Sequence, residues 1–559
     1  GLAKRGLRAI DCLRGVATRG PREQVGGAAI SRCMSFRPRE SHTMDTWKRE
    51  SNMSRFRSGA ALRRGLKTLG VLLSFVLSGA SAEELQAPKP PAVKALERGL
   101  GSLALPPGSA SLWVFDLSEG ALRAAYEAEV LRPPASLVKL LPVGAGLLSL
   151  GPDFRWGTEA WGAGNYAAGT LEGDLLLWGE GDPFFNDEAL YRFVSSLRAQ
   201  GLETVRGDLL VDSSALAPTV RDREAFDGQG DRLYNLSAHA LLLNFTAATV
   251  QLFPSGAGVG VRLSPALSAL RVENRLKLID GPCAGYQRGV AINVLGAERD
   301  VLRLEGSFPK GCERYGLTRS VLTPETYLAD RFRSLFEGLG GSWAGQVRRG
   351  RLSPELRQAA DAFDALPQRV QASTPAPPTR LLRQSSPPLD EIVWRLGKYS
   401  NNVMTTQLLL TLGRERSGEG SEAAGWQALR EVFSEAGVSL ESARLSHPAG
   451  LARDDGLSAA QLGAVLTTLW HSPRMPEFLH ALPIAGVDGT LARRFETTPF
   501  AGSAHLKTGT LAGVSNLAGY LLTRSGKRLA VVLLLQGEGV EHGLGPSLQE
   551  VVLGALWAD

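Results

Sequence analysis

Residues 513–537 read GVSNLAGYLLTRSGKRLAVVLLLQG, in which two apolar runs flank the turn-forming pair Ser525-Gly526. This pattern is a strong signal for a β-hairpin. Far upstream, SLWVFDL (111–117) and ALRAAYEAE (121–129) flank a Ser-Glu-Gly turn and predict a second hairpin. Pro546 opens a final apolar helix that ends near Trp557. The two ends of the folded chain therefore predict one sheet-and-helix domain around a distinct middle.

The middle of the chain has a different character. The run ASLVKLLPVGAGLLSL, from residue 135, predicts an apolar helix with Ser136 in its first turn. From about 152 to 365, short Gly-punctuated segments such as VRGDLLVDSS predict strands with helical pieces. Residues 371–388, QASTPAPPTRLLRQSSPP, are typical of a connector, and helical periodicity resumes at Leu389.

These patterns predict an α/β (α+β) fold in which an antiparallel sheet flanked by helices is interrupted by a large β-rich insertion. The interrupted domain has its first part at 90–155 and its second part at 371–559, with the inserted part at 156–370. A chain of 559 residues, 43% hydrophobic and 21% charged, has enough interior for several cores. This composition excludes a mainly disordered chain, a collagen-like repeat and a polytopic membrane protein.

The first 82 residues are interpreted as separate from the folded body. From Met53, a basic stretch precedes TLGVLLSFVLSGA and a small-residue site at Ala80-Ser81-Ala82, which together describe a secretory signal peptide over 53–82. Its apolar core is about half the length that spans a bilayer, so we expect no stable membrane anchor after cleavage. Residues 1–52 precede this start methionine and are interpreted as a mispredicted or non-native extension.

Charge and cysteine usage follow the same division. Residues 1–82 hold 16 Lys and Arg against 5 Asp and Glu, whereas 83–559 hold 46 against 51. The folded body is thus mildly acidic, which removes the main electrostatic argument for a nucleic-acid partner.

Beyond the signal peptide the only cysteines are Cys283 and Cys312. In an exported protein we expect them to form a disulfide, with two unrelated buried thiols as the alternative.

The chemistry-bearing residues begin with Ser136-Leu137-Val138-Lys139. A serine hydroxyl is a weak nucleophile until a base takes its proton, and residues i and i+3 share a helix face. Lys139 is therefore placed to activate Ser136. The same spacing occurs at Ser307-Phe308-Pro309-Lys310, where the proline and the following glycine predict a turn instead.

Two further motifs support the first copy. Ser400-Asn401-Asn402 contains the only Ser-x-Asn of the chain, and Lys507-Thr508-Gly509 directly precedes the final hairpin. Each motif alone has a plain structural explanation, as a helix-face pair, a polar break between helices or a turn. In this order, however, the set resembles the penicillin-recognising serine acyltransferases, which include the β-lactamases and penicillin-binding proteins.

The resemblance implies a transpeptidase-like or β-lactamase-like domain and a role for each polar residue. Lys139 would be the base, with a pKa lowered by burial and by the cation of Lys507. Ser400 would relay a proton to the leaving nitrogen, and Asn402 would hydrogen-bond Lys139 and the substrate amide.

The third motif would bind the substrate. Lys507 and Thr508 would hold a terminal carboxylate, and Gly509 would let a peptide-like ligand approach the strand edge. By resemblance, the backbone N–H groups of Ser136 and Thr510 would form the oxyanion hole.

Spacing selects a branch of this superfamily. Ser136 and Ser400 are much farther apart than the same motifs in β-lactamases. An insertion of this size is carried by the low-molecular-mass class C penicillin-binding proteins, the D-alanyl-D-alanine carboxypeptidase/endopeptidase family. Further blocks that resemble this family are Gly179-Glu180-Gly181-Asp182-Pro183, KYSNN (398–402), AGVDGTL (485–491) and KTGTLAGVS (507–515).

Several details leave alternatives open. Tyr399-Ser400-Asn401 also matches the Tyr-x-Asn pattern of another β-lactamase class, which makes Tyr399 a rival to Ser400 as the proton relay.

Where the family has Asp-Gly-Ser-Gly-Leu-Ser-Arg, residues 447–453 read HPAGLAR, and the lost hydroxyls put substrate preference in question. Arg453 is retained, either as a contact to a stem-peptide carboxylate or as a structural arginine.

Other polar residues near the motifs receive weaker interpretations. The family's acidic contact to a diamino-acid side chain falls at Asp227 or Asp231. His447 and His505 lie close to motifs, but the mechanism has no imidazole role, so they are interpreted as structural.

The sequence therefore predicts a serine DD-carboxypeptidase and DD-endopeptidase that acts on D-Ala-D-Ala or D-amino-acid cross-bridge bonds through an acyl-enzyme on Ser136. Its expected partners are peptidoglycan stem peptides and β-lactam antibiotics, and no metal or organic cofactor is implied. We expect a secreted protein, periplasmic if the source is Gram-negative.

Two other functions stay open. One is a β-lactamase-like hydrolase, although no Asn occurs between 403 and 506 to form the Glu-x-x-Asn element of class A enzymes. The other is a catalytically idle cell-wall-binding homologue, suggested by Ala449 and Ala452.

Overall fold

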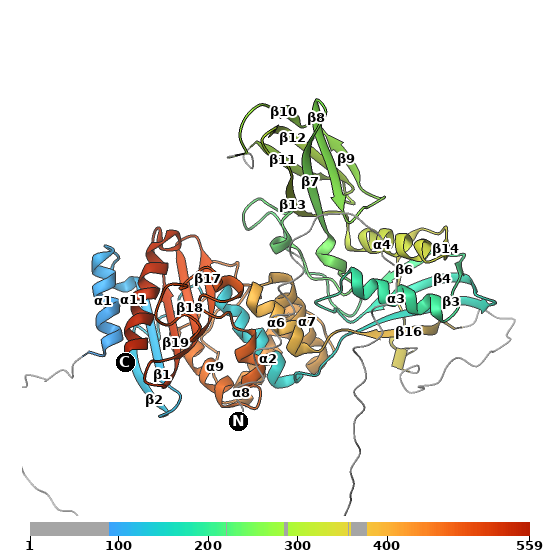
Figure 1. Ribbon diagram of the computed structural model, residues 1–559. Helices are drawn as coiled ribbons and strands as arrows, with labels where there is room; N and C mark the ends of the chain where they lie inside the picture. Colours follow the sequence, from blue (N-terminus) through green and yellow to red (C-terminus); the bar gives the residue numbers. More distant parts are fainter. Residues whose placement is uncertain (1–88, 220, 284, 286–288, 356, 359–376) are drawn as a thin grey trace, which may run out of the picture. The chain divides into compact units, whose positions relative to one another are not determined.

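The computed structural model describes residues 89–219, 221–283, 285, 289–355, 357–358 and 377–559, which belong to one compact unit, residues 84–559 (Figure 1). The predicted extension 1–52 and signal peptide 53–82 lie outside the described residues. Within the described ranges, no helix combines the length and apolar character needed to cross a bilayer.

Residues from both ends of this unit form one five-stranded antiparallel sheet, which we call the terminal sheet (Figure 1). Its strand order is β17-β18-β19-β1-β2, so β17 is an edge strand. Both predicted hairpins are confirmed, β1-β2 and β18-β19. The strands are β1 (Ala110–Asp116), β2 (Ala121–Tyr126), β17 (Ala504–Leu511), β18 (Val514–Leu522) and β19 (Arg528–Leu535).

Helices cover both faces of the terminal sheet, which explains why β19 is an unbroken apolar run. Val531 and Leu533 pack in the core with α1 and α11, whereas Val532 and Leu534 face the core of the other helices. The helices are α1 (Pro91–Ser102), α2 (Leu140–Ser149), α6 (Leu389–Tyr399), α7 (Asn402–Ser417), α8 (Glu422–Glu435), α9 (Ala459–His471), α10 (Met475–Ala481) and α11 (Leu544–Ala558). The predicted final helix is confirmed, and it begins two residues before Pro546.

Short 3₁₀ turns connect these elements, and one of them, η2, carries Ser136 and Lys139. They are η1 (Pro107–Ser109), η2 (Ala135–Lys139), η6 (Gly489–Leu491) and η7 (Val540–His542).

The inserted part is rich in strands, as predicted, with two helices packed against its largest sheet. That sheet has seven strands, with β14-β5-β4-β3-β16 as its main path and β6 and β15 beside it. Its elements are β3 (Gly157–Ala167), β4 (Thr170–Gly179), α3 (Asp187–Ala199), β5 (Thr204–Val205), β6 (Leu209–Asp212), α4 (Pro324–Gly338), β14 (Ser342–Trp343), β15 (Val347–Arg349) and β16 (Thr379–Ser385).

Two smaller sheets complete the inserted part (Figure 1). One has the order β13-β7-β8, and the other consists of β9, β10, β11 and β12. The elements are η3 (Leu233–Asn235), η4 (Leu243–Thr246), β7 (Ala247–Ser255), β8 (Gly258–Ser264), β9 (Arg271–Asn274), β10 (Lys277–Ile279), β11 (Val290–Leu295), β12 (Val301–Pro309) and β13 (Tyr315–Ser320).

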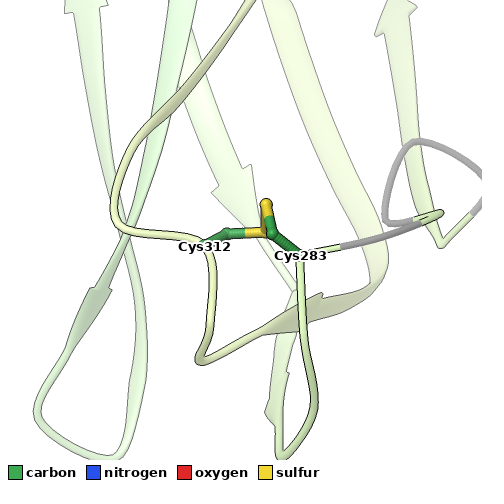
Figure 2. Close-up of a disulfide and its surroundings, with 2 residues drawn as sticks. All are labelled: Cys283 and Cys312. Atoms are coloured by element: carbon green, nitrogen blue, oxygen red, sulfur yellow. A yellow bond between two sulfur atoms is a disulfide. The ribbon is translucent and has the colours of Figure 1, made fainter.

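The predicted disulfide is confirmed. Figure 2 shows Cys283 bonded to Cys312, which lies 29 positions further along the chain. Because β10 and β12 are parallel neighbours, the bond joins the segments that follow two adjacent strand ends. It therefore fastens the smaller sheet of β9 to β12 at one end.

The interpretation of 371–388 as a connector is wrong for residues 379–385. These residues form β16, which pairs antiparallel with β3 from Thr379 opposite Gly162 to Ser385 opposite Gly157, with a register shift between Arg380 and Leu382. The prolines on either side suggested an unstructured segment, but β16 is an edge strand, where flanking prolines remove no ladder hydrogen bond. We therefore propose that the second part of the interrupted domain begins after Ser385.

Candidate active site

Ser136 and Lys139 lie in the turn η2, which begins immediately after a Pro-Pro pair. Sequence spacing predicted an α-helical turn, but the residues form a 3₁₀ turn, with Ala135 held at a φ of +48°. Side chains at i and i+3 eclipse one another in a 3₁₀ helix. This conformation brings Lys139 Nζ to 2.7 Å from Ser136 Oγ.

Lys139 is buried, with 1% of its surface exposed. Burial and the positive charge of Lys507 lower the pKa of Lys139 well below its ordinary value. Besides Ser136, its Nζ lies 3.1 Å from Ala449 O and 3.2 Å from Ser400 Oγ. A neutral amine has two N–H donors and one lone pair. The carbonyl of Ala449 only accepts, so the lone pair is available to the Ser136 hydroxyl if the second N–H donates to Ser400.

Ser400 caps the C-terminus of α6 and separates α6 from α7. Its backbone is left-handed, with a φ of 56° and a ψ of 42°, a conformation that costs a non-glycine residue about 1 to 3 kcal/mol. The side chain accepts a hydrogen bond of 2.8 Å from Lys507 Nζ, in addition to its contact with Lys139. Tyr399, the rival for the relay role, is 65% exposed and packs edge-on against Trp394. The structure thus brings Ser400, and not Tyr399, between the two amines.

Lys507 is the second buried amine, 1% exposed, and it extends from β17. Its Nζ donates to Ser400 Oγ and, at 2.9 Å, to the carbonyl of Thr508. Burial lowers the pKa of Lys507 to about 7. Because Lys139 carries the additional repulsion of its neighbour, Lys139 loses its proton first and Lys507 retains the charge.

The outer edge of β17 is partly covered and partly open. Leu506 N donates to Pro483 O, and Ile484 forms an isolated bridge with His505, so the start of the strand is paired. From Thr508 to Thr510, none of the described strands pairs with this edge. Open backbone donors and acceptors of this kind bind an extended peptide as an additional strand.

Gly509 allows the nucleophile turn to rest directly on β17. A Cβ atom at this position would lie 2.7 Å from Pro134 O and 3.2 Å from Leu137 N. The backbone on either side of Ser136 is therefore in contact with the strand that carries Lys507 and Thr510. Gly450 makes an even closer approach, because a Cβ there would lie 2.0 Å from Ala135 O, and its φ is +76°.

The segment 447–453, which departs from the family pattern, meets the site through its backbone. Lys139 contacts the carbonyl of Ala449, a group that any residue supplies, so the lost hydroxyl does not remove this contact. His447 Nδ1 accepts a hydrogen bond from Ala449 N. Burial and the nearby charge of Arg221 lower the pKa of His447 to about 3, so it is neutral.

Asn402 lies at the first turn of α7 but does not reach Lys139 by a hydrogen bond in the described part of the chain. Its Nδ2 donates to Tyr234 O, at 2.9 Å, in the inserted part. Asn402 and His447 line a hollow of about 250 Å³, together with Arg221, Tyr234 and Ala452. The amide therefore lies at the rim of the site, beside the inserted part.

Arg453 lies at the turn between β17 and β18, where its Nη1 donates to Ala512 O at 3.1 Å. The structure does not bring it into the group of lysines and serines.

Asp227 accepts hydrogen bonds from Tyr234 Oη and Asn235 Nδ2, and Asp231 forms an ion pair with Arg319. Both candidate acidic contacts thus have partners inside the inserted part.

The block 485–491 resembles the family, but its structural role could not be predicted from the sequence alone. Lys398 is 2% exposed and donates to Leu482 O and Asp488 Oδ2, both at 2.7 Å. Thr490 Oγ1 lies 3.3 Å from Thr508 Oγ1. This segment therefore links the helix end that carries Ser400 to the strand that carries Lys507. One signal in the sequence was available: the linking segment 485–491 and the block 398–402, which it contacts, both resemble the same family.

His505 lies on β17 beside the same segment. Burial and the charge of Lys398 lower its pKa, and no described residue makes a hydrogen bond to its Nδ1. Among the described residues, neither His505 nor His447 makes a hydrogen bond to Ser136, and their interpretation as structural stays a prediction.

The chain is similar to known proteins of one family. Residues 93–365 and 366–551 match the model of the D-Ala-D-Ala carboxypeptidase 3 (S13) family. The chain is 29% identical over 407 residues to a D-alanyl-D-alanine carboxypeptidase of Actinomadura sp. (strain R39), covering 69% of this chain and 70% of the relative. It is 23% identical over 427 residues to a D-alanyl-D-alanine carboxypeptidase of Haemophilus influenzae, covering 76% of this chain and 84% of the relative.

A solved structure shares the fold. The crystal structure of penicillin binding protein 4 from Haemophilus influenzae matches with a TM-score of 0.67 and 21% identity, covering 83% of this chain and 99% of that chain. The predicted fold class, a transpeptidase-like α/β domain with a large insertion, is confirmed by this match.

Proposed function

The chain belongs to the D-Ala-D-Ala carboxypeptidase 3 (S13) family, and from this premise we propose that it cleaves peptidoglycan stem peptides through an acyl-enzyme on Ser136. It is a serine DD-carboxypeptidase, and the same chemistry on a D-amino-acid cross-bridge is DD-endopeptidase action. The observation that carries the proposal is the approach of buried Lys139 to within 2.7 Å of Ser136 Oγ.

Acylation begins with proton transfer from the Ser136 hydroxyl to neutral Lys139. The serine oxygen attacks the carbonyl between two D-Ala residues, and the backbone N–H groups of Ser136 and Thr510 stabilise the negative oxygen that forms. Such donors are typically worth about 3 to 4 kcal/mol each, because they are already oriented when the charge develops.

Collapse of this intermediate breaks the carbon–nitrogen bond and releases D-Ala. The proton for the leaving nitrogen comes from Ser400, which is replenished by the amines that contact it. Water then attacks the ester at Ser136 while Lys139 takes a proton from it. Lys139 returns this proton to the Ser136 oxygen as the ester bond breaks, and the shortened peptide leaves.

The open edge of β17 holds the substrate in an extended conformation. Thr508 and Lys507 bind the terminal carboxylate. The expected role of Gly509, to let the peptide approach, is replaced by a close contact with the nucleophile turn, which occupies the space that a side chain would fill. Asn402 reaches the substrate amide from the rim of the site. A contact between Arg453 and a stem-peptide carboxylate stays a prediction, because its described hydrogen bond is to the β17-β18 turn.

Penicillins react at the same serine. The Haemophilus influenzae protein of the same fold is named a penicillin binding protein. The strained amide of a β-lactam is attacked by Ser136 as the D-Ala amide is, but the leaving nitrogen stays attached. The adduct therefore remains on the enzyme and leaves slowly.

The place of action follows from the substrate. Peptidoglycan lies outside the cytoplasmic membrane, so we propose that the protein is exported and works in the cell wall space, which is the periplasm in a Gram-negative source. The disulfide between Cys283 and Cys312 supports an oxidising compartment.

Labelled penicillin followed by peptide mapping tests the proposal. We expect a single labelled peptide with the adduct on Ser136, and D-Ala release from a D-Ala-D-Ala peptide by the same preparation. Label on another residue, or no label, contradicts the proposal. Rapid loss of the adduct would indicate a β-lactamase-like hydrolase, and binding of wall fragments without D-Ala release would indicate an idle homologue.

A further inference from the structure

Asn516 lies at the third position of β18, one strand behind the open edge of β17. It is 2% exposed, and its backbone pairs directly with Gly509. The mechanism described above makes no use of it. A buried amide in a sheet must satisfy three hydrogen-bonding groups, which makes its partners informative.

The side chain of Asn516 makes hydrogen bonds to two structures at once. Its Nδ2 donates to Pro133 O at 2.8 Å and to Pro134 O at 3.1 Å, the two carbonyls that precede the nucleophile turn. Its Oδ1 accepts a hydrogen bond of 3.0 Å from Leu535 N in β19. Both amide donors thus serve the nucleophile turn, and the acceptor fastens the amide to the sheet.

These bonds meet the nucleophile turn where it rests on β17. Pro134 O, which accepts from Asn516, is also the atom that a Cβ on Gly509 would approach to 2.7 Å, and it accepts the first hydrogen bond of η2 from Leu137 N. Gly509 immediately precedes Thr510, and Pro134 is two residues before Ser136. Asn516 is therefore bonded or paired to both backbone segments whose N–H groups form the oxyanion hole.

We propose that Asn516 is a positioning residue for the oxyanion hole, which holds the Ser136 backbone at a fixed distance from Thr510. This inference rests on the proposed function, since it concerns the same acylation step. A donor helps only when it lies about 2.7 to 3.1 Å from the developing oxyanion. A displacement of about 1 Å in a catalytic group reduces rates by about 100-fold.

The chemistry of the amide explains why this position suits Asn. Leucine has the same branched arrangement of side-chain heavy atoms, with bulkier methyl groups, but leaves the carbonyls of Pro133 and Pro134 without their side-chain donor. Aspartate places an oxygen where both neighbours are acceptors, which repels the turn from the sheet. Neither change alters Lys139 or Lys507.

The test compares Asn516→Leu and the milder Asn516→Ser with a matched control, Gln549→Leu. Gln549 is also fully buried, and its Nε2 donates to Ser515 O and Ser515 Oγ of the same strand, from α11 on the other side of the sheet. The control therefore removes two amide hydrogen bonds to β18 without touching the nucleophile turn. Calorimetry of each variant gives the folded fraction, and rates are expressed per folded molecule.

The rate of acylation by labelled penicillin is measured as a function of concentration and pH. For Asn516→Leu we expect the limiting rate constant to fall about 100-fold, with little change in the half-saturating concentration. The acid and alkaline limbs of the pH profile should occur at the same pH values as in the wild type. Asn516→Ser should fall at least about 10-fold, and Gln549→Leu should acylate at the wild-type rate.

Three results would overturn the inference. They are a folded Asn516 variant that acylates within about threefold of wild type, an equal loss in Gln549→Leu, and a displaced pH profile with an unchanged limiting rate. Failure to label the wild-type protein at Ser136 overturns the proposed function and this inference with it. Normal labelling of the wild type with unaffected Asn516 variants overturns the inference alone.

Discussion

Ser136 and Lys139 lie in a 3₁₀ turn in which the lysine is buried and the serine is half-buried, whereas Ser307 and Lys310 occupy the end of strand β12 and the turn after it. In the first segment the amine lies 2.7 Å from the serine oxygen and is 1% exposed. In the second, the Lys310 side chain is 55% exposed and forms an ion pair with Asp280. The spacing in the sequence is the same in both segments.

The difference between the segments is conformation and solvation. A 3₁₀ turn superposes side chains three residues apart, whereas an extended chain points them to opposite faces. Burial then lowers the pKa of Lys139 well below its ordinary value, whereas the Lys310 side chain is largely exposed to water. An activated serine therefore requires a turn and a buried amine in addition to the two residue types. Four predictions test this comparison.

The largest expected effect comes from the two serines. Ser136→Ala should reduce penicillin acylation by on the order of 10⁴-fold or more, because it removes the attacking oxygen. Ser307→Ala should leave acylation at the wild-type level. The measurement is the second-order rate constant of labelling, and a substantial loss in the Ser307 variant would show that the comparison is wrong.

The two lysines should differ by a smaller factor. Lys139→Met removes the general base and should reduce acylation by about 10³-fold, since general-base catalysis is usually worth 10²- to 10⁴-fold. Lys310→Met should acylate within about twofold of wild type. Both variants are assayed at the pH optimum of the wild type, with circular dichroism to establish that they are folded.

The pH profile should report the buried amines only. Acylation rises as pH passes the lowered pKa of Lys139, because the base must be neutral, and it falls as Lys507 loses its proton near its pKa of about 7. Lys507→Arg keeps the charge at high pH, so the alkaline limb should move up by roughly two pH units or more. Lys310→Met is the control, and a shift of either limb in that variant would contradict the assignment.

The smallest expected effect is on stability and compares two Lys–Asp ion pairs. Lys398–Asp488 (2.7 Å) has a buried lysine beside Ser400, whereas Lys310–Asp280 (2.8 Å) is exposed at both ends. Lys398→Met should lower the free energy of unfolding by about 2 kcal/mol, less than a fully buried pair because Asp488 is partly exposed. Lys310→Met should change it by less than about 1 kcal/mol. Thermal unfolding of both variants gives the comparison, and equal losses would contradict it.

The sequence was sufficient wherever one local rule decided the outcome. The hairpin at 513–537 has apolar runs on either side of Ser525-Gly526, and no competing period obscures it. The site residues come from three distant stretches of the chain, yet the family resemblance carried by the order of their motifs was enough to place them in one site. They are Ser136 with Lys139, Ser400, and Lys507. The pattern is informative because each residue type has a distinct chemical task.

Other features depend on contacts that no local pattern encodes. Strand β16 was missed because prolines flank it and its partner β3 lies more than two hundred residues earlier. Asn402 was expected to bond with Lys139, but the carbonyl of Ala449 takes that place. Asn516 was not singled out at all, since an Asn in a strand has no motif, and its partners Pro133 and Pro134 are distant in sequence.

The pairing of Gly157 with Ser385 has a consequence for how such a protein arises. The main chain beside it is also joined, because Ser386 N donates to Trp156 O. The inserted part therefore departs and returns at adjacent points, so a gene for a shorter ancestral enzyme could acquire it in one recombination event without rearranging its core. For protein engineers, the same geometry marks 157 and 385 as the junction at which to exchange this module between homologues.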